Sequence, residues 1–142
     1  MRAIPRYELS LVLFFLSSLI TVPLFAADVL YVTNFDDGGP GNPLPGSLRQ
    51  VIASAHNGDI VLFDPSLLTQ CPCKVSVRIA PIPINSDITI LGPGSGQLAI
   101  SANPAYANGI FQVNQSNVTV TSIGLSRAWA LAGSAVKVSG GN

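Results

Sequence analysis

The sequence contains little charge, one histidine, two cysteines and one tryptophan. Only 10% of its 142 residues are charged and the formal net charge is zero, whereas about 25% of the residues in an ordinary globular domain are charged. Binding of nucleic acid or of an anionic membrane surface needs a cationic field, so this balance argues against both. No aspartate or glutamate follows Asp87, and acid–base catalysis needs positioned proton donors and acceptors. The composition therefore favours a protein that is not an enzyme.

One apolar run stands apart at the N-terminus. Residues 9–22 carry no charge, two arginines precede them, and the small residues Ala26 and Ala27 follow. A basic start, a short apolar stretch and small residues at its end are typical of a secretory signal peptide. A membrane span needs about 20 apolar residues, so the run is short for an uncleaved anchor, which is the alternative interpretation. We expect residues 1–27 to be a signal peptide that is cleaved after Ala26 or Ala27.

Residues 28–142 form the expected mature chain. They contain no second long apolar run, so we expect no transmembrane span and a location in the periplasm, on the cell surface or outside the cell. Segments with apolar residues at every second position predict strands with one apolar face. Residues 60–63 are apolar throughout, which predicts a strand covered on both faces, one of them by a helix. The expected strands are residues 29–33, 60–63, 74–79, 88–90, 98–100, 111–113, 118–121, 123–125 and 136–138.

One segment has helical rather than strand spacing. Ser47 can cap a helix, because its hydroxyl accepts a backbone N–H, and apolar residues then recur on one face. Asn57-Gly58 supplies a C-terminal stop. We expect one short helix over residues 47–56, no second helix, and packing of its apolar face over the first layer of strands. The residues of this face are Leu48, Val51 and Ile52.

A degenerate repeat relates the strands. Residues 118–120 (Val-Thr-Val) repeat residues 88–90 (Ile-Thr-Ile), and residues 123–125 correspond to residues 98–100. Corners rich in glycine and asparagine separate these strands, and such residues adopt the positive φ that tight corners need. Short strands with such corners are typical of a sandwich, a barrel or a solenoid. The repeat favours a coiled stack of layers.

Four motifs follow one another early in the mature chain: residues 31–34 (Tyr-Val-Thr-Asn), 46–52 (Gly-Ser-Leu-Arg-Gln-Val-Ile), 58–59 (Gly-Asp) and 63–65 (Phe-Asp-Pro). Together they resemble the opening of secreted bacterial right-handed parallel β-helix proteins with the pectin-lyase-like fold. These are surface proteins of the adhesin or polymorphic outer membrane protein type. The resemblance implies an all-β solenoid whose first rung is capped by the short helix. The segments that resemble its first full rungs are residues 87–95 and 110–114.

The resemblance implies one domain over residues 28–142, formed by an N-terminal cap and the first rungs. It also implies an exported, non-enzymatic protein whose partners are glycans or host or cell-surface proteins. Two alternatives remain: a fragment of a polysaccharide lyase or hydrolase on the same fold, and a small secreted β-sandwich binding module. A solenoid needs a cap at each end, and the sequence stops soon after the strand at 136–138. We therefore expect a chain truncated at its C-terminus that self-associates through an open last rung.

Few residues are candidates for a site, and we expect no catalytic, cofactor-binding or metal-binding residue. Cys71 and Cys73 are the only cysteines. Export permits a disulfide between them, but the small Cys-Pro-Cys ring is geometrically demanding, so free or intermolecular thiols remain an alternative. Two thiols alone do not make a zinc site. Trp129 can stack on a sugar ring or cover a hydrophobic edge.

Three further side chains have simpler interpretations. Asp36 and Asp37 lie in a loop with some likeness to a calcium loop, but the missing oxygen ligands favour ordinary turn residues. His56, at the end of the expected helix, is placed to interact with its carbonyls, and no nucleophile for it to activate is evident. Arg49 is expected to have a structural role in the helix as a donor to strand-end carbonyls.

Overall fold

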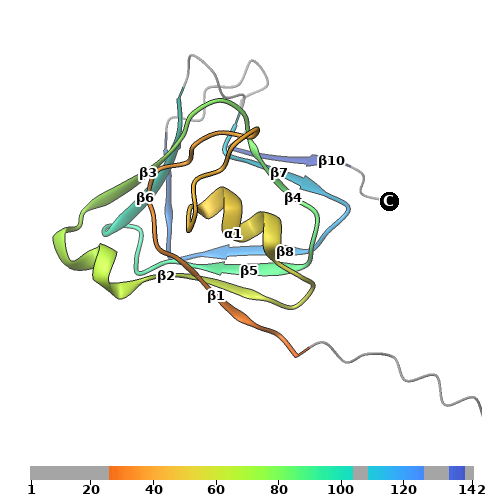
Figure 1. Ribbon diagram of the computed structural model, residues 1–142, viewed down its shortest axis with the longest axis horizontal. Coiled ribbons are helices and arrows are strands. Elements are labelled where there is room, and N and C mark those ends of the chain that lie inside the picture. Colours follow the sequence, from red (N-terminus) through yellow and green to blue (C-terminus); the bar gives the residue numbers. More distant parts are fainter. Residues whose placement is uncertain (1–25, 104–108, 127–134, 140–142) are drawn as a thin grey trace, which may run out of the picture.

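The computed structural model describes residues 26–103, 109–126 and 135–139 (Figure 1). It contains the α-helix α1 (Leu48–Ser54) and the 3-10 helix η1 (Pro65–Gln70). The strands are β1 (Val29–Val32), β2 (Ile60–Phe63), β3 (Cys73–Val77), β4 (Ile82–Ile84), β5 (Ile88–Leu91), β6 (Leu98–Ala102), β7 (Phe111–Asn114), β8 (Val118–Thr121), β9 (Gly124–Ser126) and β10 (Val136–Ser139).

The strands form three sheets around a common interior (Figure 1). The first sheet has the order β1-β2-β5-β8, the second β4-β7-β10 and the third β3-β6-β9. Every pairing between these strands is parallel. The protein is therefore mainly β-structure built from parallel sheets, in agreement with the all-β class expected from the sequence.

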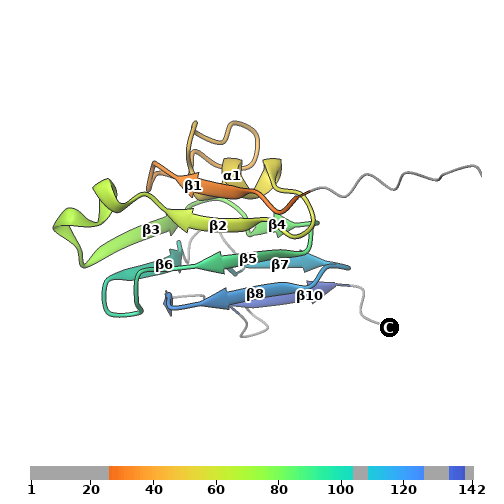
Figure 2. The ribbon, with the colours of Figure 1, turned by 90° about the horizontal axis from the view of Figure 1, so that it is seen from below.

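The chain passes through the sheets in a constant order. It runs through β2, β3 and β4, then β5, β6 and β7, then β8, β9 and β10, and each group forms one layer (Figure 2). Paired residues in successive layers lie about 25 to 30 positions apart, as in Ile88 with Val118 and Ile100 with Leu125. These pairs confirm the correspondence that the sequence repeat predicted between residues 88–90 and 118–120, and between 98–100 and 123–125.

Alternation along the strands places apolar side chains inside. In β5, Ile88 and Ile90 are buried, whereas Leu91 is exposed on the outer face. Burying a side chain of this size stabilises the fold by about 1.5–3 kcal/mol. The largest fully buried side chains come from every layer except the last: Val32, Leu48, Val61, Val75, Val77, Ile82, Ile84, Ile90, Leu98, Ile100, Ile110 and Phe111.

The helix α1 covers the interior at one end of the stack, where it packs on β1 and β4 (Figures 1 and 2). Ser47 is its N-cap, and the Ser47 hydroxyl accepts the backbone N–H of Gln50 at 3.2 Å. Gly46 has a φ of 71°, a conformation that favours glycine, and its carbonyl accepts backbone N–H groups from the strand segment after β1. The helix ends at Ser54, earlier than expected, because Ala55 is already extended.

The structure corrects two expectations about secondary structure. A second helical segment, η1, exists although none was expected: Asp64 accepts the backbone N–H of Ser66, and Pro65 occupies the first helical turn. Strand β4 was not expected, because Pro83 interrupts the pattern of a central strand. Since β4 is the edge strand of its sheet, the missing N–H of Pro83 leaves no ladder position empty.

Two apolar residues lie elsewhere than expected. Ile79 was assigned to a strand over residues 74–79, but β3 ends at Val77 and Ile79 is 52% exposed. Leu62 was expected beneath a helix, but it is only partly buried on the outer face of β2. The reason is that α1 lies over the interior between β1 and β4 and not over the outer face of β2.

Candidate functional site

The first end of the stack, which we call the capped end, is formed by α1 and the loop before it. Leu48, Val51 and Ile52 are all buried there and join the core. Leu48 is 1% exposed. These apolar side chains occupy the place that a further layer of strands would take, so the interior is shielded from water at this end.

A buried ion pair fixes the loop to α1. Arg49 is only 3% exposed. Its guanidinium donates to both carboxylate oxygens of Asp37, at 2.7 and 2.8 Å. It also donates to the carbonyls of Ala80 and Pro81 between β3 and β4, which confirms the structural role expected of this arginine. Asp37 further accepts the backbone N–H of Arg78 at 3.2 Å, so one ion pair joins the loop, the helix and a strand corner.

The neighbouring pair is exposed. The guanidinium of Arg78 donates to Asp36 at 2.7 Å, and both side chains are more than half exposed. Asp36 and Asp37 therefore each face an arginine. From its sequence context, Asp37 was expected to be an ordinary turn residue. This interpretation missed that its carboxylate is buried. An arginine on the apolar side of a helix was the signal that a buried acidic partner exists, because such a charge needs one.

A second buried carboxylate binds the backbone. The Asp59 side chain is 3% exposed, and it accepts the N–H of His56 at 2.8 Å and the N–H of Asp28 at 2.9 Å. These two hydrogen bonds, the one from His56 first, hold the pKa of the Asp59 carboxyl below its ordinary value, with burial acting in the opposite direction. The imidazole of His56 is largely exposed, and its Nδ1 lies 3.9 Å from the nearer carboxylate oxygen.

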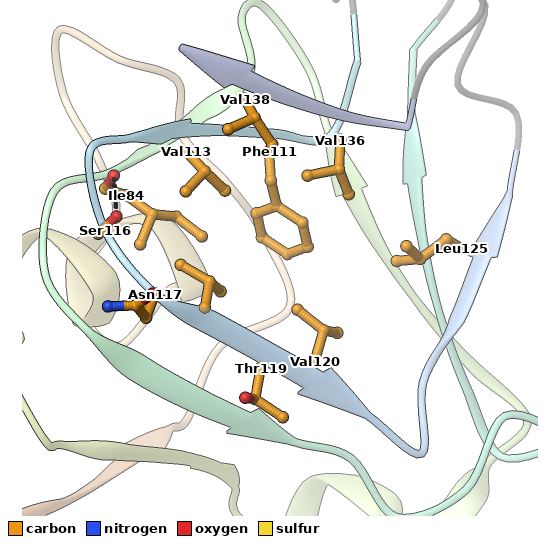
Figure 3. Close-up of a pocket in the computed structure, with 11 residues that line it drawn as sticks. Ile84, Phe111, Val113, Ser116, Asn117, Thr119, Val120, Leu125, Val136 and Val138 are labelled. Atoms are coloured by element: carbon orange, nitrogen blue, oxygen red, sulfur yellow. Dashed lines mark hydrogen bonds between the residues drawn. The ribbon is translucent and has the colours of Figure 1, made fainter. Parts of the chain in front are cut away.

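The opposite end of the stack, which we call the open end, is formed by the edge strands β8, β9 and β10. A hollow of about 650 Å³ lies there. The side chains of Phe111, Val120 and Leu125 converge on it from three different strands (Figure 3). Val138 is 67% exposed and Leu125 38%. The described residues that line the hollow are apolar or uncharged, and several of its apolar side chains are in contact with water.

A smaller hollow lies on the side of the first sheet. It has a volume of about 250 Å³ and is lined by residues of β1, β2, η1 and β5 and of the corner after β5. Tyr31 and Leu91 are both exposed at its rim. The residues that line it are Tyr31, Leu62, Phe63, Pro65, Leu68, Leu91, Gly92 and Pro93.

The remaining sequence candidates are the two cysteines, the two alanines of the expected cleavage site and the tryptophan. Cys71 and Cys73 form a disulfide at the start of β3, with their Cα atoms 4.4 Å apart. Ala26 and Ala27 are exposed before β1. Trp129 lies outside the described residues. Neither the two cysteines nor the two alanines are among the residues that line the hollow at the open end.

Within residues 26–103, 109–126 and 135–139, no group of three or more histidine, cysteine, aspartate or glutamate side chains is placed to hold a metal ion. The same residues include no helix that is both long enough and apolar enough to cross a membrane. No protein-family model, curated protein or solved structure matches this chain.

Proposed function

We propose that this chain is the N-terminal, capped segment of an exported right-handed parallel β-helix. The protein that contains it is, in this proposal, a non-enzymatic secreted or cell-surface protein of the adhesin type. The observation that carries the proposal is the contrast between the two ends of the stack. Leu48 at the capped end is 1% exposed, whereas Val138 at the open end is 67% exposed. The capped end terminates the stack, and the open end is the surface on which a further layer of parallel strands pairs.

The strand arrangement supports a β-helix over the β-sandwich alternative. All described strand pairs are parallel, whereas β-sandwiches are built from antiparallel sheets. A stack in which each layer contributes one strand to each of three sheets buries its apolar residues between layers. Each layer then depends on its neighbours for burial.

The proposed occupant of the open end is a layer of strands rather than a small ligand. The strands β8, β9 and β10 are all edge strands in the described structure, and the N–H and C=O groups along a sheet edge can pair with a further extended chain. Val136 and Val138 add apolar side chains beside these groups. An additional layer would satisfy the backbone and cover the apolar surface at the same time.

The aspartates support a structural role over catalysis. Asp37 pairs with Arg49, Asp59 accepts backbone N–H groups, and Asp87 accepts the backbone N–H of Asn117 at 2.7 Å. Each carboxylate therefore holds neighbouring backbone or a loop. Among the described residues, no charged side chain lines either hollow, whereas a polysaccharide lyase or hydrolase needs acid and base groups beside its substrate.

Export and the adhesin type rest on the sequence. The apolar run before Ala26 and Ala27 supports export, and the motifs at residues 31–65 support the β-helix surface proteins. Partners of such a protein are glycans or proteins of another cell surface. The open end is used for assembly of the stack in this proposal, so the outer faces of the sheets are the surfaces that remain for a partner.

Light scattering of the purified chain without its leader tests the role of the open end. We expect concentration-dependent self-association, because an uncovered apolar edge pairs with another copy when no further layer is present. Val138→Lys places a charge on this edge and should shift the population toward monomer. Ile79→Lys is the matched control, since Ile79 is also exposed but lies away from the open end, and it should leave association unchanged. A monodisperse wild-type monomer, or equal effects of both variants, contradicts the proposal.

A further inference from the structure

The backbone N–H of Asp28 is hydrogen-bonded to a buried carboxylate. Its N–H donates to Oδ1 of Asp59 at 2.9 Å, and the carbonyl of Asp28 accepts the N–H of Ile60 at 2.9 Å. Both the N–H and the carbonyl of Asp28 are therefore hydrogen-bonded at the start of β2. The second oxygen of Asp59 binds the N–H of His56 at 2.8 Å, which fixes the carboxylate in place.

The peptide bond that contains this nitrogen is at the surface. Ala26, Ala27 and Asp28 are all exposed as residues, and ordered strand structure begins at Val29. The bond between Ala27 and Asp28 also follows one of the two small residues after which the leader is expected to be removed. The nitrogen that such a cleavage would release is the one that Asp59 already binds.

We propose that removal of the leader between Ala27 and Asp28 creates an α-ammonium group that pairs with the buried carboxylate of Asp59 and thereby fastens β1 to the stack. In the cleavage, water adds across the peptide bond and the C–N bond breaks. Ala27 leaves with the carboxylate, and the nitrogen of Asp28 takes up the protons. The inference relies on the proposed export for the cleavage step only, because the pairing itself is a property of the folded chain.

The charges favour this pairing. An α-amino group has an ordinary pKa of about 7.7–8.0, so it is mostly protonated at neutral pH. The Asp59 carboxyl is ionised there, because backbone hydrogen bonds from His56 and Asp28 lower its pKa. Among the described residues, the titratable side chains near this position are those of Asp28 and His56 and, one layer further, Asp87, whose carbonyl accepts the N–H of Gly58. A fixed cation at Asp28 would complement this mainly anionic surrounding.

The consequence is that the folded chain gains the stabilisation from this ion pair only after the leader is removed. In the precursor, the nitrogen of Asp28 is a neutral amide that donates one hydrogen bond. In the processed chain it is a cation beside a buried anion, so the attraction between opposite charges adds to the hydrogen bond. Strand β1 covers the edge of β2 at the capped end, so anchoring its first residue strengthens that end.

The first test locates the cleavage. The full chain is expressed in a Gram-negative host, and the protein recovered from the periplasm is sequenced from its N-terminus. We expect Asp28 as the first residue. A first residue of Ala27 contradicts the proposed cleavage. Absence of any export contradicts the proposed function instead, and the pairing is then judged by the second test alone.

The second test isolates the pairing. Chains that begin at Asp28 and at Ala27 are released from a cleavable carrier and unfolded in denaturant at pH 7. We expect the Asp28 form to have an unfolding equilibrium constant about tenfold lower, because its amine is placed on the Asp59 carboxylate. Asp59→Asn should abolish this difference, whereas Asp87→Asn, which alters a similar backbone-binding carboxylate, should leave it intact. Equal stability of the two wild-type forms, or a difference that survives Asp59→Asn, overturns the proposal.

Discussion

Individual charged residues in this protein hold backbone segments together across long sequence distances. Arg49 reaches the Asp37 carboxylate and two carbonyls between β3 and β4. A buried charge is tolerated only with such partners, and removal of one partner leaves the other uncompensated. Arg78 and Asp36 form an exposed ion pair. Water solvates either side chain when the other is removed, so the pair contributes little to the stability of the fold.

The two ion pairs should respond very differently to mutation. Asp37→Ala should lower the free energy of unfolding by about 3–5 kcal/mol, because it leaves the guanidinium of Arg49 buried without a counter-charge. Asp36→Ala should lower it by at most about 1 kcal/mol. Chemical denaturation followed by circular dichroism measures both values. A loss of at most about 1 kcal/mol in both variants would contradict this expectation and would show that water or another group compensates Arg49 when Asp37 is removed.

Asp59 should make stability depend on acid pH. Its pKa is lower in the folded chain than the ordinary value, which is about 3.9 for an unfolded aspartate. Its stabilising contribution is therefore fully present above about pH 4 and is lost as the pH falls through the lower folded pKa. Asp59→Asn should be clearly less stable than the wild type at pH 7, and this difference should narrow on acidification. A difference that stays constant down to pH 3 would contradict the assignment.

Sequence reasoning identified some of these roles and missed others. It expected Arg49, in the capping helix, to have a structural role as a donor to strand-end carbonyls, and Arg49 does donate to two carbonyls between β3 and β4. It did not find the partner Asp37, since an Asp-Asp-Gly loop resembles a simple turn. The pairing is set by how the loop folds back on α1, and neither residue type nor spacing specifies that path.

At the scale of elements, packing decides whether α1 forms. It has only seven residues, and isolated helices of this length are not stable in water. Ser47 caps its first turn, and the side chain of Gln50 accepts the N–H of Gly46 at 3.2 Å. These bonds fix where the helix begins, but burial of its apolar face against β1 and β4 supplies most of its stability.

Two substitutions in α1 separate packing from capping. Leu48→Ala should lower the free energy of unfolding by about 2–5 kcal/mol, because it empties a fully buried position in the core. Gln50→Ala should lower it by at most about 1 kcal/mol, since the exposed side chain contributes one hydrogen bond. Thermal or chemical melts of both variants test this. Equal effects would rule out the packing of α1 over the interior.

Most strands could be predicted from alternation, and the exceptions have physical causes. Strand β4 was missed because Pro83 is unfavourable in a central strand, and only the edge position of β4 makes it acceptable. The short helix η1 begins with a local hydrogen bond from the N–H of Ser66 to the Asp64 carboxylate, and a sequence that allows this bond is equally common in simple turns. The outer faces of strands were harder to predict, because alternation does not show which face another element covers.

At the scale of the whole molecule, the structure is a stack with unequal ends. Residues about 25 to 30 positions apart pair in every sheet, so each layer rests on the one before it. The repeat in the sequence predicted this register for β5 with β8 and for β6 with β9. It could not predict how the interior is closed, because the closure uses α1 and the Arg49–Asp37 pair, which occur once and have no counterpart in the repeat.

Cross-linking between layers tests the stacked parallel arrangement most directly. Thr89 and Thr119 are paired residues of β5 and β8, and neighbouring strands lie about 4.8 Å apart, within the range of Cα separations found in disulfides. The double variant Thr89→Cys/Thr119→Cys should lose both new thiols on mild oxidation, as counted by mass spectrometry after alkylation. The control variant Thr89→Cys/Lys137→Cys joins positions in two different sheets and should keep its thiols. Retention of both thiols in the first variant, or equal loss in the control, would contradict the stack.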